Sequence, residues 1–109
     1  MELIDNAEVH EFHFQGNFQQ TLAGPNQGLK TFEVWRLSVA PGHELPADVH
    51  QGEEVVLFMS GTGCLEVDGK RIVIRPDTTM VIPPGTSRQI FNTGVEELFL
   101  LLVRGVVPA

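Results

Sequence analysis

The chain has 109 residues and a mass of 12.0 kDa, which fits one domain and is too short for two ordinary ones. Hydrophobic residues make up 42% and charged residues 19%, a balance that argues against a disordered chain. The 14 acidic residues outnumber the 7 basic ones, and this acidity argues against a general binder of the nucleic-acid backbone, which needs a basic face.

The start of the chain and its cysteine content bear on the compartment. Met1–Asp5 is acidic and lacks the basic start and apolar stretch of a signal peptide. The longest apolar run, Leu98–Val103, is far shorter than the roughly 18 residues of a membrane span. The single cysteine, Cys64, excludes an internal disulfide and fits a reducing compartment. We therefore expect a cytoplasmic protein without membrane or nucleic-acid partners.

Short runs rich in Val, Ile, Phe and Leu alternate with turns that contain Gly or Pro, and no stretch keeps a helical period. Val9–Phe14 is a candidate edge strand. Phe14–Gly28 has the character of a loop, or of a segment ordered against a neighbouring subunit. The other predicted strands are Phe32–Val39, Glu54–Met59, Gly63–Val67, Arg71–Ile74, Met80–Ile82, Arg88–Asn92 and Leu98–Val103. Many short strands predict an all-β sandwich or barrel.

Two features refine this prediction. Asp68-Gly69 between two strands is typical of a tight hairpin, because a type I′ turn needs a positive φ that Gly accepts freely. Leu98–Val103 is apolar on both faces, so we expect it to be covered on both sides. A second sheet would cover one face, and a partner chain is the candidate for the other.

A first motif begins at Gly42 and includes His50, Glu54 and Gly61. This spacing resembles the first motif of the cupin family, which is Gly, five residues, His-x-His, three or four residues, Glu, six residues, Gly. Asp48 replaces the first histidine of the pair. The oxygen-bearing side chain at that position changes the set of metal donors that the family pattern would supply.

A second motif follows after a short segment. It resembles the second cupin motif, which is Gly, five residues, Pro-x-Gly, two residues, His, three residues, Asn. Pro83, Gly85 and Asn92 match this pattern. Asp77 stands in place of the opening Gly, and Arg88 stands in place of the His.

The resemblance implies a double-stranded β-helix, the jelly-roll cupin barrel. It predicts a single domain, with a barrel over residues 31–109 and an N-terminal strand and loop over residues 1–30 that pack on the barrel or on a partner. Small cupins resemble one another in forming dimers through a β face, so we expect a homodimer.

Asp48, His50 and Glu54 carry oxygen, nitrogen and oxygen donors. Asp48 and His50 are two residues apart and point the same way on one strand. In cupins the glutamate points inward after a bend, so the resemblance implies that the three could hold a divalent metal. Because two of the donors are carboxylates, the set leans toward manganese, with zinc, iron and nickel as the other candidates.

Arg88 supports a second interpretation. A guanidinium stays protonated and cannot ligate a metal, whereas it pairs with carboxylates in bidentate geometry. Asp48, Arg88 and Glu54 would then form a buried network that replaces the metal. Two adjacent buried carboxylates need a positive charge, and Arg88 supplies one. We favour this network and keep the metal site as the alternative.

Two functions follow from these interpretations. The first is a small-molecule-binding cupin with a degenerate metal site. The second is a metal-dependent enzyme, such as a dioxygenase, isomerase or polyketide cyclase, acting on a small organic substrate. His50, Glu54 and Arg88 are its catalytic candidates, with His50 as the base. Side chains in pleat phase with Glu54 and Arg88 are expected to line the pocket. They are Val56, Phe58, Ile90 and Asn92.

Overall fold

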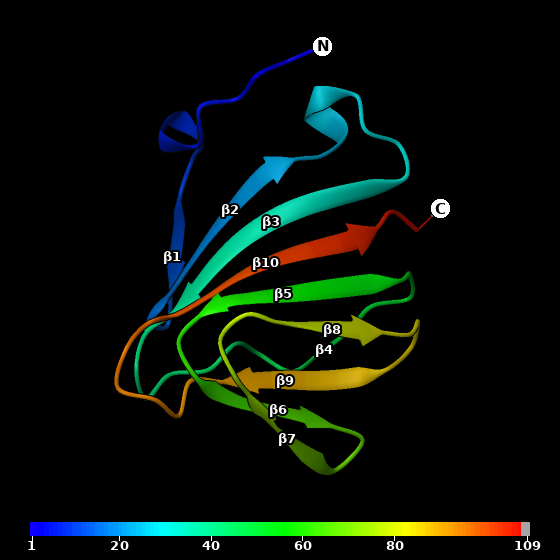
Figure 1. The fold of residues 1–109 in the computed structure, drawn as a ribbon. Coiled ribbons are helices and arrows are strands. Elements are labelled where there is room, and N and C mark those ends of the chain that lie inside the picture. Colours follow the sequence, from blue (N-terminus) through cyan, green and yellow to red (C-terminus); the bar gives the residue numbers. More distant parts are fainter. Residues whose placement is uncertain (108–109) are drawn as a thin grey trace.

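The computed structural model describes residues 1–107, which form two antiparallel β-sheets and two short 3-10 helices (Figure 1). One sheet has six strands in the order β1-β2-β3-β10-β5-β8, and the other has four in the order β4-β9-β6-β7. The all-β prediction is confirmed. Among the described residues, no helix is long and apolar enough to cross a membrane. The elements are η1 Asn6–Glu8, β1 Phe12–Phe14, β2 Asn17–Ala23, η2 Pro25–Gln27, β3 Phe32–Val39, β4 Asp48–Val49, β5 Glu54–Ser60, β6 Gly63–Val67, β7 Lys70–Ile74, β8 Thr78–Ile82, β9 Ser87–Phe91 and β10 Leu98–Gly105.

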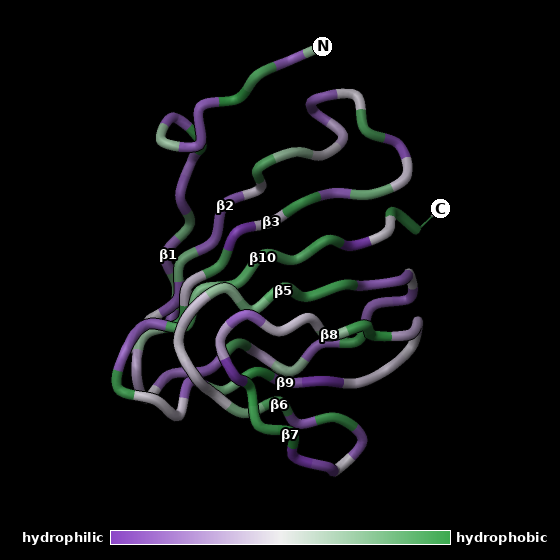
Figure 2. The backbone as a smooth tube through the Cα atoms, in the orientation of Figure 1, coloured by the Kyte–Doolittle hydropathy of each residue, from purple (hydrophilic) through white to green (hydrophobic). Residues whose placement is uncertain are grey.

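The core lies between the two sheets, and β10 shows how the sequence builds it. Leu98, Leu100 and Leu102 alternate along β10 and are buried against the smaller sheet. Leu101, on the opposite face, is only half buried, and Phe99 is exposed. The predicted second sheet therefore covers one face of this strand. In Figure 2, most of β10 and of its neighbour β5 is green, the colour of hydrophobic residues, and each strand turns purple toward one end.

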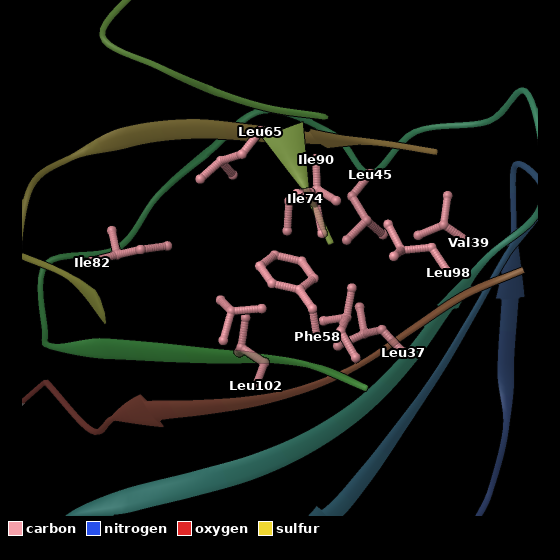
Figure 3. Close-up of a cluster of buried hydrophobic side chains, with 12 residues drawn as sticks. Leu37, Val39, Leu45, Phe58, Leu65, Ile74, Ile82, Ile90, Leu98 and Leu102 are labelled. Atoms are coloured by element: carbon pink, nitrogen blue, oxygen red, sulfur yellow. The ribbon is translucent and has the colours of Figure 1, made fainter. Parts of the chain in front are cut away.

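Phe58 on β5 lies in the middle of this core, with Leu102 and Leu37 on its own sheet and Ile90 and Ile74 across from it (Figure 3). All five side chains are buried. Burying a phenylalanine side chain of this kind stabilises the fold by about 1.5–3 kcal/mol. The core therefore holds the two sheets face to face at the level of Phe58.

The segment predicted as a loop contains a strand. Asn17–Ala23 forms β2, which pairs antiparallel with β3 from Asn17 opposite Val39 to Ala23 opposite Val34. The prediction of a loop over Phe14–Gly28 is therefore wrong for its central part. The polar sequence of β2 hid it, because strand residues are usually β-branched or aromatic.

Gln20 explains why a polar residue is stable in β2. Its side chain is fully buried, and its amide nitrogen donates to the backbone oxygens of Asn6 and Val9 at 2.9 and 3.0 Å. Its amide oxygen accepts hydrogen bonds from Arg36. All the hydrogen-bonding groups of the side chain thus have partners, as buried polar groups require. These bonds hold the segment around Asn6 and Val9 against β2.

The predicted hairpin is present between β6 and β7. Val67 pairs with Lys70, so the connection has two residues. Asp68 and Gly69 have φ angles of 49° and 76°, as a type I′ turn requires.

We expect Gly69→Val to lower the free energy of unfolding by about 1–2 kcal/mol, because a β-branched residue is strained at positive φ. A Cβ at this position would have no other atom within 4 Å, so the loss reports backbone strain and not a steric clash of the Cβ. The melting temperature should fall by about 4–8 °C for each kcal/mol. Gly69→Asn is the control, since Asn tolerates positive φ and should cost much less. An equal loss in both variants would contradict the turn assignment.

Candidate functional site

Four charged side chains meet between the sheets and form what we call the charge cluster: Asp48, Glu54, Arg88 and Arg104. In the smaller sheet, Asp48 on β4 lies directly opposite Arg88 on β9. In the larger sheet, Glu54 on β5 lies directly opposite Arg104 on β10. Each sheet therefore contributes one acid and one base, and the hydrogen bonds of the cluster run within and between the sheets.

Glu54 is the buried centre of the cluster, with only 1% of its side chain exposed. Arg88 donates to its Oε1 from Nε at 3.2 Å and from Nη2 at 3.0 Å, and to Oε2 from Nη2 at 2.9 Å. Arg104 donates to Oε2 from Nε at 3.0 Å and from Nη2 at 2.6 Å. The cost of burying this carboxylate is thus offset by two guanidinium groups in forked geometry.

Asp48 is more open, with 42% of its side chain exposed. Arg104 Nη2 donates to its Oδ2 at 2.7 Å, and Arg88 Nη2 lies 3.5 Å from the same atom. Burial acts to raise the pKa of Asp48, but the hydrogen bond from Arg104 and the charges of both arginines outweigh it and hold the pKa below its usual value. Asp48 is therefore ionised at neutral pH.

The pKa of Arg104 is shifted in the opposite direction. Burial acts to lower its pKa, but hydrogen bonds to Glu54 and Asp48 and the charges of both carboxylates outweigh burial and raise the pKa above its usual value. Its guanidinium carbon also lies 4.6 Å from the ring centroid of Trp35, a cation–π distance. Arg104 thus joins the two carboxylates to the aromatic side chain beside them.

A cavity of about 300 Å³ opens at the charge cluster. Three cluster members line it, and the six-stranded sheet contributes two aromatic and two leucine side chains. The lining residues are Phe14, Gln19, Trp35, Leu37, Leu45, Pro46, Ala47, Asp48, Arg88, Leu102 and Arg104. A small apolar pocket with a few convergent polar groups is the usual form of a small-molecule site.

A larger hollow of about 900 Å³ lies elsewhere, where Phe18, Ser38 and Phe99 contribute to its wall. Three of the polar side chains on its wall, Arg36, Ser38 and Glu97, are already paired. Ser38 Oγ donates to Glu97 at 3.0 Å, and Arg36 donates to a buried glutamine. We therefore place the candidate site in the smaller cavity, where buried charges face the open space.

The structure places the predicted site residues in two groups. Asp48, Glu54 and Arg88 come together with the ion pairs that the network interpretation describes. His50 does not join them. Its Nε2 lies 2.7 Å from the backbone oxygen of Gly105, so it donates a hydrogen bond there and connects the loop before β5 to the end of β10. The side chain that the sequence analysis proposed as a base therefore makes a hydrogen bond to the backbone.

The predicted pocket residues lie in the core and not in the lining of this cavity. Val56, Phe58 and Ile90 are buried among the packed side chains of both sheets. Asn92 donates from Nδ2 to the backbone oxygens of Val39 and Glu96, both at 2.8 Å, and fixes a turn. Pleat phase places these side chains on the inner faces of the sheets, where they are packed in the core.

The residues present do not fit a metal ion. Residues 1–107 contain no group of three His, Cys, Asp or Glu side chains that could hold one. The expected set of Asp48, His50 and Glu54 is not brought together in this structure, because His50 is directed to Gly105 and both carboxylates are paired with guanidinium groups. Two permanent positive charges at the donor atoms would repel a cation.

Arg104 and Trp35 belong to the candidate site but were not predicted from the sequence. Arg104 follows directly after the apolar run of β10, in phase with Leu98, Leu100 and Leu102. Residues two apart on a strand face the same way, so this spacing places Arg104 on the inner face. The spacing is the sequence signal that could have identified Arg104. Trp35 has the inward phase of Leu37 on β3, but the sequence alone did not separate it from the core.

The fold and the site define a class: a small antiparallel barrel with a polar cluster at its mouth, built on two spaced motifs. The family profile of the cupin domain matches residues 35–104. The chain belongs to the cupin family.

Curated relatives extend this assignment. The chain is 35% identical over 98 residues to auxin-binding protein 1 of Arabidopsis thaliana, a match that covers 81% of this chain and 50% of that protein. It is 32% identical over 94 residues to auxin-binding protein T85 of Nicotiana tabacum, with 76% and 50% covered. The chain therefore spans about half the length of the curated relatives it matches.

Solved structures confirm the jelly-roll cupin fold. A predicted oxalate decarboxylase from Thermotoga maritima superposes with a TM-score of 0.85 at 21% identity, covering 97% of this chain and 100% of that one. The polyketide cyclase RemF from Streptomyces resistomycificus superposes with a TM-score of 0.82 at 18% identity, covering 96% and 79%. At these identities the likeness concerns the fold alone.

We expect Arg88→Ala to lower the free energy of unfolding by about 3 kcal/mol, because it removes one of the two cations from a buried carboxylate. The value lies at the low end of the usual range because Arg104 still contacts Glu54. Urea denaturation measures the loss. The control is Arg71→Ala, whose ion pair with Glu66 is exposed and should contribute less than about 1 kcal/mol. Equal losses in the two variants would contradict the role of the charge cluster.

Proposed function

We propose that this cupin binds a small organic molecule in the cavity at the charge cluster, and that it does so without a metal ion. The observation that carries the proposal is the 300 Å³ cavity, in which two arginines and Asp48 face apolar side chains. A metal-dependent dioxygenase, isomerase or cyclase is not favoured, because arginines bind the carboxylates that such a site would need.

The relatives support the choice of a small-molecule ligand. The two curated relatives reported above are named for binding auxin. The region shared with them includes about four-fifths of this chain in the Arabidopsis match. We take from this a class of function, the binding of a small organic molecule, and derive the ligand's chemistry from the cavity itself.

The fluorescence of Trp35 can be used to measure ligand binding directly. It is the only tryptophan, the chain has no tyrosine, and the side chain lines the cavity. We expect compounds from a panel of neutral, cationic and anionic small molecules to change Trp35 emission in a saturable way. The same compounds should raise the melting temperature, since a ligand that binds only the folded state stabilises it. Removing metals with a chelator should change neither result.

Ala47→Phe should weaken this binding, because Ala47 lines the cavity and a larger side chain would fill it. Ala7→Phe is the control, since Ala7 is exposed and does not line the cavity. Metal content of the purified protein is measured by mass spectrometry. Stoichiometric manganese, zinc, iron or nickel, with binding lost on chelation, would contradict the proposal.

We also propose that two copies associate through the outer face of the six-stranded sheet. Leu101 and Val103 on β10 face outward beside Leu57 on β5, and all three are only half buried. Phe99 and Met59 extend this apolar face and are exposed. Contiguous apolar surfaces of this kind mark association sites.

Light scattering should give a particle of twice the 12.0 kDa chain mass at micromolar concentration. Leu101→Glu should convert it to a monomer, because it places a charge in the middle of the apolar face. Val73→Glu is the matched control, since Val73 is exposed on the smaller sheet. A monomer in the unmodified protein would refute the homodimer.

A further inference from the structure

The two carboxylates of the charge cluster are held unequally. Glu54 is almost fully buried and is bonded by both arginines. Asp48 accepts from Arg104 at 2.7 Å, lies 3.5 Å from Arg88, and exposes 42% of its side chain. It also belongs to β4, a strand of two residues at the edge of the smaller sheet. Asp48 is therefore the cluster member that an outside group can replace most easily.

The cavity lining has more charged donors than acceptors. Arg88 and Arg104 both line it, whereas Asp48 is the one carboxylate among its lining residues. Trp35 also lines the cavity, and its indole Nε1–H is buried and has no acceptor among the described residues. A buried donor without an acceptor is unfavourable. A ligand that brings acceptor oxygens would complement this lining.

The remaining walls are apolar. The apolar walls come from Phe14, Leu37, Leu45, Pro46 and Leu102, of which the three leucines belong to the buried core. The volume of about 300 Å³ lies at the lower end of the range for ligand pockets. The cavity is therefore suited to one ring or a short aliphatic chain.

Resting on the proposed small-molecule function, we infer that the ligand is a small monocarboxylate with an apolar body, and that its carboxylate takes the place of Asp48 on Arg104. The arginine fork matches a carboxylate in bidentate geometry. After the exchange, two carboxylates still face two guanidinium groups, so the buried cluster keeps its charge balance. Asp48 is already half in solvent and moves fully into it.

The test uses benzoate and hexanoate as probes, with benzamide and hexanamide as neutral analogues of the same shape. Titrations are followed by Trp35 emission in the full chain. We expect each acid to bind at least tenfold more tightly than its amide, because the amide carries no charge for Arg104. Raising the salt concentration should weaken binding of the acids and leave binding of the amides unchanged.

Two variants test the exchange itself. Asp48→Asn removes the internal competitor and leaves the cluster with one extra positive charge, so both acids should bind severalfold more tightly. A gain in affinity cannot arise from misfolding. Arg104→Gln should weaken acid binding at least tenfold, with its melting temperature measured alongside. The control is Asp77→Asn, because Asp77 is exposed at a φ of 59° that Asn also adopts.

The outcomes separate this inference from the proposed function. Amides that bind as tightly as the acids, or an Asp48→Asn variant without tighter binding, would overturn the carboxylate inference and leave small-molecule binding standing. Binding only of unrelated compounds from the panel would do the same. If no compound in the panel changes Trp35 emission, both fail. Should Arg104→Gln not fold, the Asp48→Asn titrations decide the question alone.

Discussion

The burial of the Glu54 carboxylate is the constraint on which the structure around the cavity depends. An ionised carboxylate with 1% of its side chain exposed is tolerated only when cations and hydrogen bonds replace water. Arg88 from one sheet and Arg104 from the other meet this need. Because the two arginines come from different sheets, satisfying one carboxylate also fixes how the sheets face each other at the barrel mouth.

This requirement also shapes the cavity. Arg104 lies against Trp35, which gives the guanidinium an aromatic face, and the ring then forms part of the wall. Asp48 completes the charge balance from the edge strand β4, at the rim, where solvent still reaches it. The two carboxylates of the site therefore differ in exposure: Glu54 is buried and paired with both arginines, whereas Asp48 is accessible to solvent. Both carboxylates are already paired with arginines, which disfavours the binding of a cation. An anion, in contrast, can pair with an arginine by displacing the accessible carboxylate, Asp48.

The sequence was sufficient for most strands from Phe32 onward and for three of the four members of the charge cluster. Apolar runs bounded by Gly and Pro placed every strand from Phe32 onward within two residues of its observed ends, apart from the two-residue β4. The motif positions of Asp48, Glu54 and Arg88 predicted their network. Arg104 was missed because it is fifty residues from Glu54, and their pairing depends on the register between β5 and β10. β2 was missed because its buried Gln20 is satisfied by distant backbone groups.

The departures from the cupin motifs are therefore linked through the register of two sheets. The acid at Asp48 and the base at Arg88 are directly opposite on neighbouring strands, as are Glu54 and Arg104. Beside Glu54 and Arg104, the change to Arg88 alone would leave one excess positive charge, and the change to Asp48 alone would leave one excess negative charge. With Arg104 present, both changes balance, and the cluster is neutral. The core residues of the barrel take no part in this cluster, so the fold does not depend on which polar groups stand at these motif positions.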